Sequence, residues 1–450
     1  MINVSSAMKA AFRADSMFKY YTLVFPEYTN EGKTYPEKII NNASLLSDSV
    51  TLTEPMCSEE QLKFGCCEAA TFEFEMQYES ENLAGRIFNV YLTFEGLDEV
   101  FTVGRYIVDT EEMSNDRKSK AITAYDIMYV LNMLDVFYWY HTLSYPLTIK
   151  QVRDSLFEYI GQEQVSINLP NDNIVLSKDP LEQETDITFE MILKPLCEVN
   201  GVFGHINRDG YFEYKKLVAE STDETYPNSD LYPSSTLYPM SLKSKNYYIE
   251  PELIKSDITW QNYKCKTVDT VQARDSSGNV LYEYHLPEKT TYTNVYVLQG
   301  NWIIDALDSS QIQALIYNFA NAIKDITYTP CDANVKMNLS LEVGDAIMLM
   351  ATDGTKIPTY IFNRTMTGIT HSFDEIEATG YEEWINEPPN TESGMQDIMD
   401  DLIDLNDRLT DVEGKQASGE GSITIESVQQ LPASPRKNVL YLVQGKVYVQ

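Results

Sequence analysis

The sequence has few basic residues for its length. Lys and Arg number 34 against 68 Asp and Glu in 450 residues, which leaves a formal net charge of -34 at pH 7. A surface that holds DNA needs clustered Lys and Arg to contact phosphates, so this composition argues against a nucleic-acid-binding protein. It is compatible with a surface past which DNA slides without binding, and equally with acidity that serves solubility.

Long hydrophobic runs and secretion signals are also missing. The N-terminus has no apolar central stretch of the kind found in signal peptides. The most apolar window, 127–139, is too short to span a bilayer, and Asn132 and Asp135 interrupt it. We therefore expect a soluble chain that is made in the cytoplasm and has no membrane anchor.

Cysteine is scarce, with six residues in the chain. So few cysteines in a chain of this length do not make a disulfide scaffold. Cys57, Cys66 and Cys67 lie close together in the sequence, but no C-x-x-C or Cys/His spacing typical of zinc accompanies them. We interpret these three thiols as small buried hydrophobic groups, and we expect neither a metal nor a cofactor.

Motifs of catalysis are missing too. No His-Glu-x-x-His, Gly-x-Ser-x-Gly or Gly-x-x-x-x-Gly-Lys pattern occurs, and the histidines are scattered at His141, His205, His285 and His371. No sequence pattern singles out one of the three neighbouring cysteines and a histidine as a peptidase pair. None singles out two of the many carboxylates as a glycosidase pair either. Asp275 and Asn279 lack the spacing of a calcium-binding loop. We expect no catalytic residues.

Tyrosine is abundant, with 31 residues, and aromatic residues at this density favour strands. From Phe64 to Tyr78 apolar and acidic residues alternate, which predicts a strand with one buried face and one wet acidic face. Further strands are predicted over 87–94, 100–108 and 121–125. This antiparallel meander is typical of a small barrel or sandwich.

Helix signals follow the meander. Asp126 is predicted to cap a helix over 127–134, and Thr148 with Gln151 forms a capping box for a helix that stops at Gly161. A third helix is predicted to start near Asp186 or Thr188 and to run to Val199. A hairpin with a tight turn at 208–210 comes next. Later signals predict strands over 246–300, a helix capped by Asp308 or Ser309, and strands over 335–350 and 360–381.

Residues 218–243 change character. Tyr-Pro recurs every six residues, at Tyr226, Tyr232 and Tyr238. Proline fixes φ and lacks a backbone donor, so this segment is predicted to be an extended arm. The arm either connects two domains or contacts a neighbouring subunit.

A heptad pattern follows a linker at 387–394. Its apolar residues are spaced 3, 4, 3, 4, 3 and form one narrow seam: Met395, Ile398, Leu402, Leu405, Leu409 and Val412. Such a seam needs identical partner helices, because a helix this short is marginal alone in water. The pattern predicts a short coiled coil that joins copies of the chain, and the alternative is an amphipathic helix docked on its own domain. Residues 422–450 then predict two or three short strands.

Four segments follow one another in a characteristic order. They are 104–108 followed by 123–126 and a helix, 198–201 with the hairpin around 207–210, the Leu-Tyr-Pro repetition at 231–239, and 341–345 with 365–368 and 378–380. In this order they resemble the tail-tip hub family of phages and prophages of Gram-positive bacteria. Members are also called tail-associated or prophage endopeptidase tail proteins, and they are similar to the central hub of contractile baseplates.

The resemblance implies an α+β, mostly β chain. It has two small antiparallel barrel-like hub domains with an inserted helix-and-hairpin region, then a short coiled coil and a terminal β segment. We expect a first hub domain at 1–125, an α+β insertion with the Tyr-Pro arm at 126–245, a second hub domain at 246–390, a coiled-coil stalk at 391–415 and a C-terminal β segment at 416–450.

The resemblance also implies a function. The chain is expected to be a non-enzymatic structural protein of a phage or phage-like tail tip or baseplate, a homotrimeric hub that closes the distal tail tube and gates genome passage. Implied partners are the distal tail protein ring, the tape-measure protein and receptor-binding or fibre proteins, while DNA passes without binding. Many relatives continue into long wall-degrading or receptor-binding regions, and this sequence ends soon after the heptads, which favours the non-enzymatic interpretation.

Two alternatives stay open. One is a tail-associated cell-wall hydrolase. The other is a receptor-binding or glycan-binding adhesin that uses exposed tyrosines such as Tyr232 of the arm.

Replacing Leu402 and Leu405 with Asp is expected to weaken self-association at least tenfold, because charge is placed inside the apolar seam. Sedimentation velocity over a range of protein concentrations measures the effect. The control Gln396→Asp adds charge outside the seam and should leave association unchanged. A double variant that associates as tightly as the parent would contradict the coiled-coil interpretation.

Overall fold

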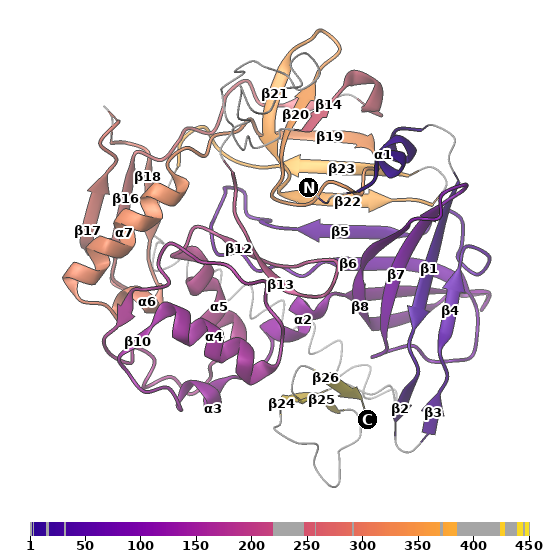
Figure 1. Ribbon diagram of the computed structural model, residues 1–450, viewed down its shortest axis with the longest axis horizontal. Helices are drawn as coiled ribbons and strands as arrows, with labels where there is room; N and C mark the ends of the chain where they lie inside the picture. The colour runs from indigo at the N-terminus through magenta and orange to yellow at the C-terminus, as the bar shows by residue number, and fades with distance from the viewer. Residues whose placement is uncertain are drawn as a thin grey trace, which may run out of the picture.

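The computed structural model describes residues 2, 4–14, 18–30, 33–218, 247–256, 258–289, 292–369 and 372–384, and the backbone of three short strands within 424–449. Strands dominate this part of the chain, and the helices gather mainly in its middle (Figure 1). The expected fold class, α+β and mostly β, is confirmed. Among these residues no helix is both long enough and apolar enough to cross a bilayer.

One antiparallel sheet of eleven strands forms the framework. Seven strands come from the N-terminal part of the chain: β1 (Lys19–Phe25), β4 (Lys38–Asn41), β5 (Thr51–Pro55), β6 (Thr71–Gln77), β7 (Ile87–Phe94), β8 (Val100–Met113) and β9 (Ser119–Tyr125). Four come from its later part: β15 (Thr259–Trp260), β19 (Cys331–Lys336), β22 (Asn363–Thr367) and β23 (Phe373–Ala378). The spatial order is β15-β19-β23-β22-β5-β6-β9-β8-β7-β1-β4.

The two groups of strands meet where β5 pairs with β22. The register runs antiparallel from Thr51 opposite Thr367 to Pro55 opposite Asn363. Strands from distant parts of the sequence therefore share one hydrogen-bonded ladder. Figure 1 shows β22 and β23 lying directly beside β5 and β6, while β1, β4, β7 and β8 turn steeply away.

The hydrophobic core beneath the N-terminal strands is completed by later residues. Helix α1 (Ser6–Arg13) contributes Met8 and Phe12, and the strands contribute inward side chains such as Phe72 and Phe88. The later part of the chain supplies four members of the same cluster: Met337, Leu339, Met366 and Ile369. A short ribbon of β2 (Tyr28–Asn30) and β3 (Lys33–Tyr35) extends from these strands.

The insertion between the two groups of strands contains the three predicted helices and the predicted hairpin, together with a short helix and a pair of two-residue strands that the sequence did not predict. Its elements are α2 (Ile127–Asn132), α3 (Phe137–Tyr140), β10 (Leu147–Thr148), α4 (Ile149–Ile160), β11 (Val175–Leu176), α5 (Phe189–Glu198), β12 (Phe203–Ile206) and β13 (Phe212–Lys215). Asp126 and Thr188 cap α2 and α5, and the Thr148–Gln151 capping box starts α4, which ends at Gly161.

Two smaller sheets belong to the later part of the chain. The first contains β14 (Tyr247–Ile249), β20 (Ala346–Met350) and β21 (Lys356–Tyr360), with a 3-10 turn at Pro251–Leu253. The second contains β17 (Val280–His285), β16 (Thr270–Arg274) and β18 (Val295–Leu298), and α7 (Ser309–Ile323) packs against it after α6 (Trp302–Asp305). Asp308 caps α7 in a capping box with Gln311.

Three strands near the C-terminus form a separate small sheet. They are β24 (Thr424–Ser427), β25 (Val439–Val443) and β26 (Lys446–Val449). β24 runs parallel to β25, and β25 and β26 form an antiparallel pair.

The predicted strand from Phe64 to Tyr78 is wrong in its first part. Regular pairing begins at Thr71, as β6. Gly65 has a φ of 94°, which L side chains rarely adopt, and an added Cβ would lie 2.7 Å from the Cβ of Glu198 on α5. The chain therefore turns tightly against α5 at Gly65 before the strand starts, although the apolar and acidic residues already alternate there.

Candidate functional site

A buried arginine lies where the two groups of strands meet. Burial alternates along β22, and Arg364 occupies an inward position with a fully buried side chain. Its Nη2 donates to the Asp374 carboxylate and to the carbonyl of Asn338, both at 2.7 Å. Its Nη1 donates to the carbonyl of Leu341. One guanidinium thus connects β22, β23 and the loop after β19.

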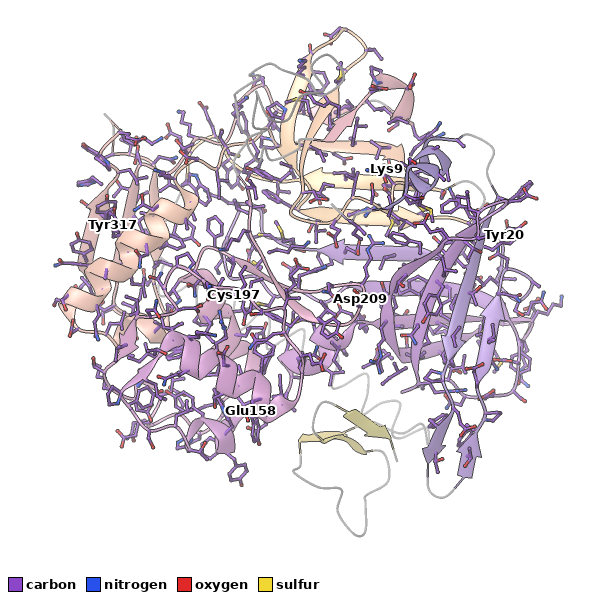
Figure 2. All side chains as sticks on the ribbon, in the orientation of Figure 1. Lys9, Tyr20, Glu158, Cys197, Asp209 and Tyr317 are labelled. Atoms are coloured by element: carbon purple, nitrogen blue, oxygen red, sulfur yellow. The ribbon has the colours of Figure 1, made fainter. Side chains whose placement is uncertain are left out.

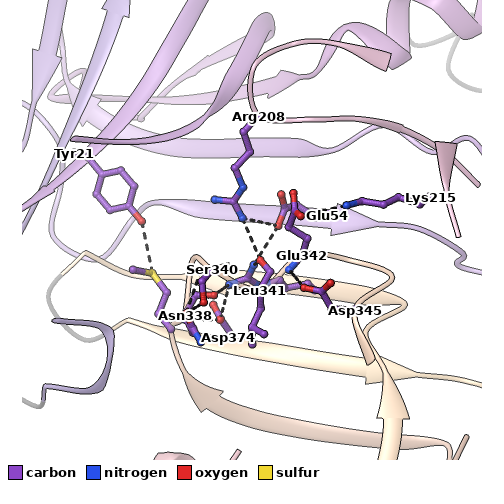
Figure 3. A network of polar contacts seen from close by, with 12 residues as sticks. Tyr21, Glu54, Arg208, Lys215, Asn338, Ser340, Leu341, Glu342, Asp345 and Asp374 are labelled. Carbon is purple, nitrogen blue, oxygen red and sulfur yellow. Dashed lines mark hydrogen bonds and ion pairs between the residues drawn. The ribbon is translucent and has the colours of Figure 1, made fainter. Parts of the chain in front are cut away.

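The insertion reaches the same place through the turn of its hairpin. Arg208, between β12 and β13, donates from Nη2 to the carbonyl of Leu341 at 3.3 Å. Glu54 on β5 lies between the two arginines, with its Oε2 3.6 Å from Nη1 of Arg364 and 3.9 Å from Nη2 of Arg208. Figure 3 shows Glu54 from the N-terminal strands, Arg208 from the insertion and Asp374 from the later strands converging on this place.

The charges of this network balance. Arg364 and Arg208 face Asp374 and Glu54, and all four residues are buried. Burial alone would lower the pKa of Arg364, but attraction to Asp374 and Glu54 outweighs it and raises that pKa, so the guanidinium stays charged. Burial raises the pKa of Asp374, and attraction to the Arg364 guanidinium only partly offsets this, so the buried carboxyl depends on its arginine partner.

A second ion pair ties the hairpin to the later strands. Lys215 on β13 lies 3.2 Å from Oε2 of Glu342, whose backbone N–H donates to Asp345 at 2.9 Å. Burial raises the pKa of Glu342, but the positive charges of Lys215 and Arg208 outweigh it, so the pKa lies below its usual value. The network around Arg364 and the Lys215–Glu342 ion pair both connect structural elements. Together they form a joint between the N-terminal strands, the insertion and the later strands.

The outward face of the sheet beside this joint is polar and acidic. Thr53 and Thr365 face each other across β5 and β22, with their Oγ1 atoms 3.5 Å apart. On either side the outward positions carry carboxylates, which are Glu73 and Glu75 on β6, Glu375 and Glu377 on β23, and Asp332 on β19. Their parity places them on the same face as the two threonines.

The cysteines are buried free thiols, which confirms the interpretation of Cys57, Cys66 and Cys67. The Sγ atoms of Cys57 and Cys66 lie 3.7 Å apart, and Cys67 lies 3.9 Å from Cys197 on α5. Close packing explains these distances, because all four side chains belong to one hydrophobic cluster.

The histidines that the structure describes lie on separate elements. His141 follows α3, His205 lies on β12, and His285 ends β17. Within the described ranges no three His, Cys, Asp or Glu side chains gather closely enough to hold a metal ion. His371 lies outside those ranges.

The residues predicted to mediate assembly also lie outside the described residues. They are the heptad positions Met395, Ile398, Leu402, Leu405, Leu409 and Val412, and the arm positions Tyr226, Tyr232 and Tyr238. Their roles stay predictions.

The sequence reasoning missed the buried network. A signal was present, since Arg364 and Glu54 occupy inward positions in strands whose outward positions are uncharged, Thr53 and Pro55 on β5 and Asn363 and Thr365 on β22. A charged residue at an inward position predicts a buried ion pair. Its partners come from distant segments, however, and no local pattern identifies them.

Arg364→Met is expected to lower the free energy of unfolding by roughly 3–5 kcal/mol, because Asp374 and Glu54 lose their main compensating charge. Urea unfolding measures the loss. The double variant Arg364→Met/Asp374→Asn should recover part of it, since one buried carboxylate is then neutral. A loss below 1 kcal/mol in the single variant would contradict the role of the arginine.

The protonation of His205 is expected to contribute to the pH dependence of stability. Burial, followed by the positive charge of Lys215, lowers its pKa to about 4. As pH falls from about 6.5 to about 4, the unfolded chain binds a proton that the native chain does not, so stability decreases by roughly 3 kcal/mol. His205→Gln should remove this part of the slope in urea unfolding between pH 7.5 and 4.5. The exposed His141→Gln should keep it, and an unchanged slope in His205→Gln would contradict the assignment.

No protein-family model matches the sequence, and no curated protein matches it either. Several solved structures are similar to it. A tail protein from Neisseria meningitidis is 13% identical, with 81% of this chain and 98% of that chain covered and a TM-score of 0.43. The 43 kDa tail protein of prophage MuSo2 from Shewanella oneidensis is 10% identical, with coverages of 80% and 98% and a TM-score of 0.44. A prophage tail protein from Listeria monocytogenes is 13% identical, with coverages of 80% and 95% and a TM-score of 0.43.

Proposed function

We propose that the chain is a structural, non-enzymatic subunit of a phage or phage-like tail tip. In this proposal it assembles as a homotrimeric hub that closes the distal end of the tail tube. The observation that carries the proposal is the pairing of β5 with β22, which sets two groups of antiparallel strands side by side in one chain.

In this proposal each group of strands counts as one β unit of the ring. Two units in each chain, at 1–125 and 246–390, become six units when three copies form a ring, and six units match a tube with sixfold symmetry. The buried network around Arg364 keeps the two units of one chain in a fixed relation. A ring that closes a tube needs this rigidity, because a flexible joint would spread the units over many angles.

The acidic outward face of the sheet supports passage of DNA without binding. Glu73, Glu75, Glu375 and Glu377 project from one face at the joint. Phosphates are repelled by carboxylates, so DNA that passes such a face does not adhere. In this proposal the hub works in the virion tail tip, next to the distal tail protein ring and the end of the tape-measure protein.

The purified chain is expected to sediment as a trimer at micromolar concentration. Tails assembled with a tagged chain, imaged with a gold-labelled antibody, should carry the label at the distal end of the tube. A stable monomer, or label distributed along the tube, would contradict the proposal.

A further inference from the structure

One stretch of the large sheet presents an outer face that carries no carboxylate and a single charged side chain, that of Arg105. On β1 and β4 the outward side chains include Tyr20, which is 44% exposed, and Ile39, which is 56% exposed. On β8 the outward Val100 is 57% exposed. The strands β4, β1, β7 and β8 lie side by side, so these side chains share one surface.

The strand pairing registers identify the side chains on this face. Three rows of paired residues cross this face, and their side chains are Ile, Val, Tyr, Thr, Asn and one Arg. The row that contains the single charge is Ile39, Val24, Asn89 and Arg105. Carboxylates occupy the same face farther along the sheet, for example Glu73 on β6. We call this stretch on β4, β1, β7 and β8, which has Arg105 as its one charged side chain, the neutral sheet face.

An uncharged surface lies on α7. Its fifteen residues include no charged side chain. Tyr317 is 52% exposed on its outer side, and its ring lies 5.5 Å from that of Tyr284 on the edge strand β17. Glu283 on this strand alternates with Tyr284, so its side chain lies on the other face of β17. We call this surface the α7 face.

The two surfaces lie at opposite ends of the molecule. Figure 2 shows Tyr317 at one end of the long axis and Tyr20 at the other. Surface helices and open sheet faces normally carry charges, and exposed apolar patches mark interaction sites. Two different patches at opposite ends suit a head-to-tail contact, which closes into a ring when the rotation allows.

Electrostatics identifies the occupant of these surfaces. Each copy carries a formal net charge of -34, so two copies repel each other over most of their surfaces. Contact between copies is opposed least where carboxylates are missing, and both faces meet that condition. A basic partner would instead be expected to bind acidic regions such as the outward positions of β6.

We propose that the neutral sheet face of one copy packs against the α7 face of the next copy. This inference rests on the proposed homotrimer and names the surfaces through which it closes. Three such head-to-tail contacts complete the ring, and each copy uses both of its faces.

Cysteine cross-linking tests the contact. Tyr20→Cys and Tyr317→Cys each add one exposed thiol to a chain whose six native thiols are buried. A mixture of the two variants, treated with a short bismaleimide, should give covalent dimers, and a chain with both substitutions should give covalent trimers. The control mixture pairs Tyr20→Cys with Tyr138→Cys on α3, where Tyr138 is 76% exposed, and should give none.

Charge insertion gives an independent measurement. Val100→Asp and Tyr317→Asp are each expected to weaken trimer formation at least tenfold in sedimentation experiments, whereas Tyr138→Asp should have no effect. Circular dichroism checks that each variant is folded.

The outcomes separate this inference from the proposed function. A parent protein that is trimeric but gives no cross-link between positions 20 and 317, and keeps its association constant with Val100→Asp, would overturn the contact and leave the hub standing. A monomeric parent protein would overturn both. Cross-linked trimers together with weakened charge variants would support the contact.

Discussion

The pairing of β5 with β22 is the constraint on which the rest of the structure depends. It brings an early strand and a late strand into one ladder, and the side chains beneath that ladder come from both parts of the chain. The insertion is held at the same place, because Arg208 in its hairpin and Arg364 on β22 donate to a single carbonyl, that of Leu341. Three regions therefore share one joint.

We expect the buried charges at this joint to contribute more to the choice of strand register than to net stability. Removing four charges from water is costly, and their mutual attraction offsets much of that cost without a large surplus. The positions of these charged side chains, however, are compatible with only one register between β5 and β22. A slip of one residue between β5 and β22 would turn Arg364 outward and leave Asp374 and Glu54 buried without it. The network thus fixes the register of a ladder whose outward threonines, such as Thr53 and Thr365, would tolerate several alignments.

The elements that the sequence predicted correctly are those specified within a few residues. The capping box of Thr148 and Gln151 and the alternation around Phe72 and Phe74 each contain their own signal. The start of β6 was predicted too early, because alternation says nothing about the turn that Gly65 makes against α5. The buried network was missed for a related reason: its members lie in short strands and loops far apart in the sequence, and only the folded chain brings them together.

The shared core has a consequence for synthesis. The N-terminal strands leave the ribosome long before Met337, Leu339 and Met366, which belong to the same hydrophobic cluster. Until these residues emerge, the early sheet has an incomplete interior and an unpaired edge at β5, both of which invite association with other nascent chains. Expression yield should therefore depend on translation speed and chaperone supply, and truncations that end before β22 should accumulate as insoluble material.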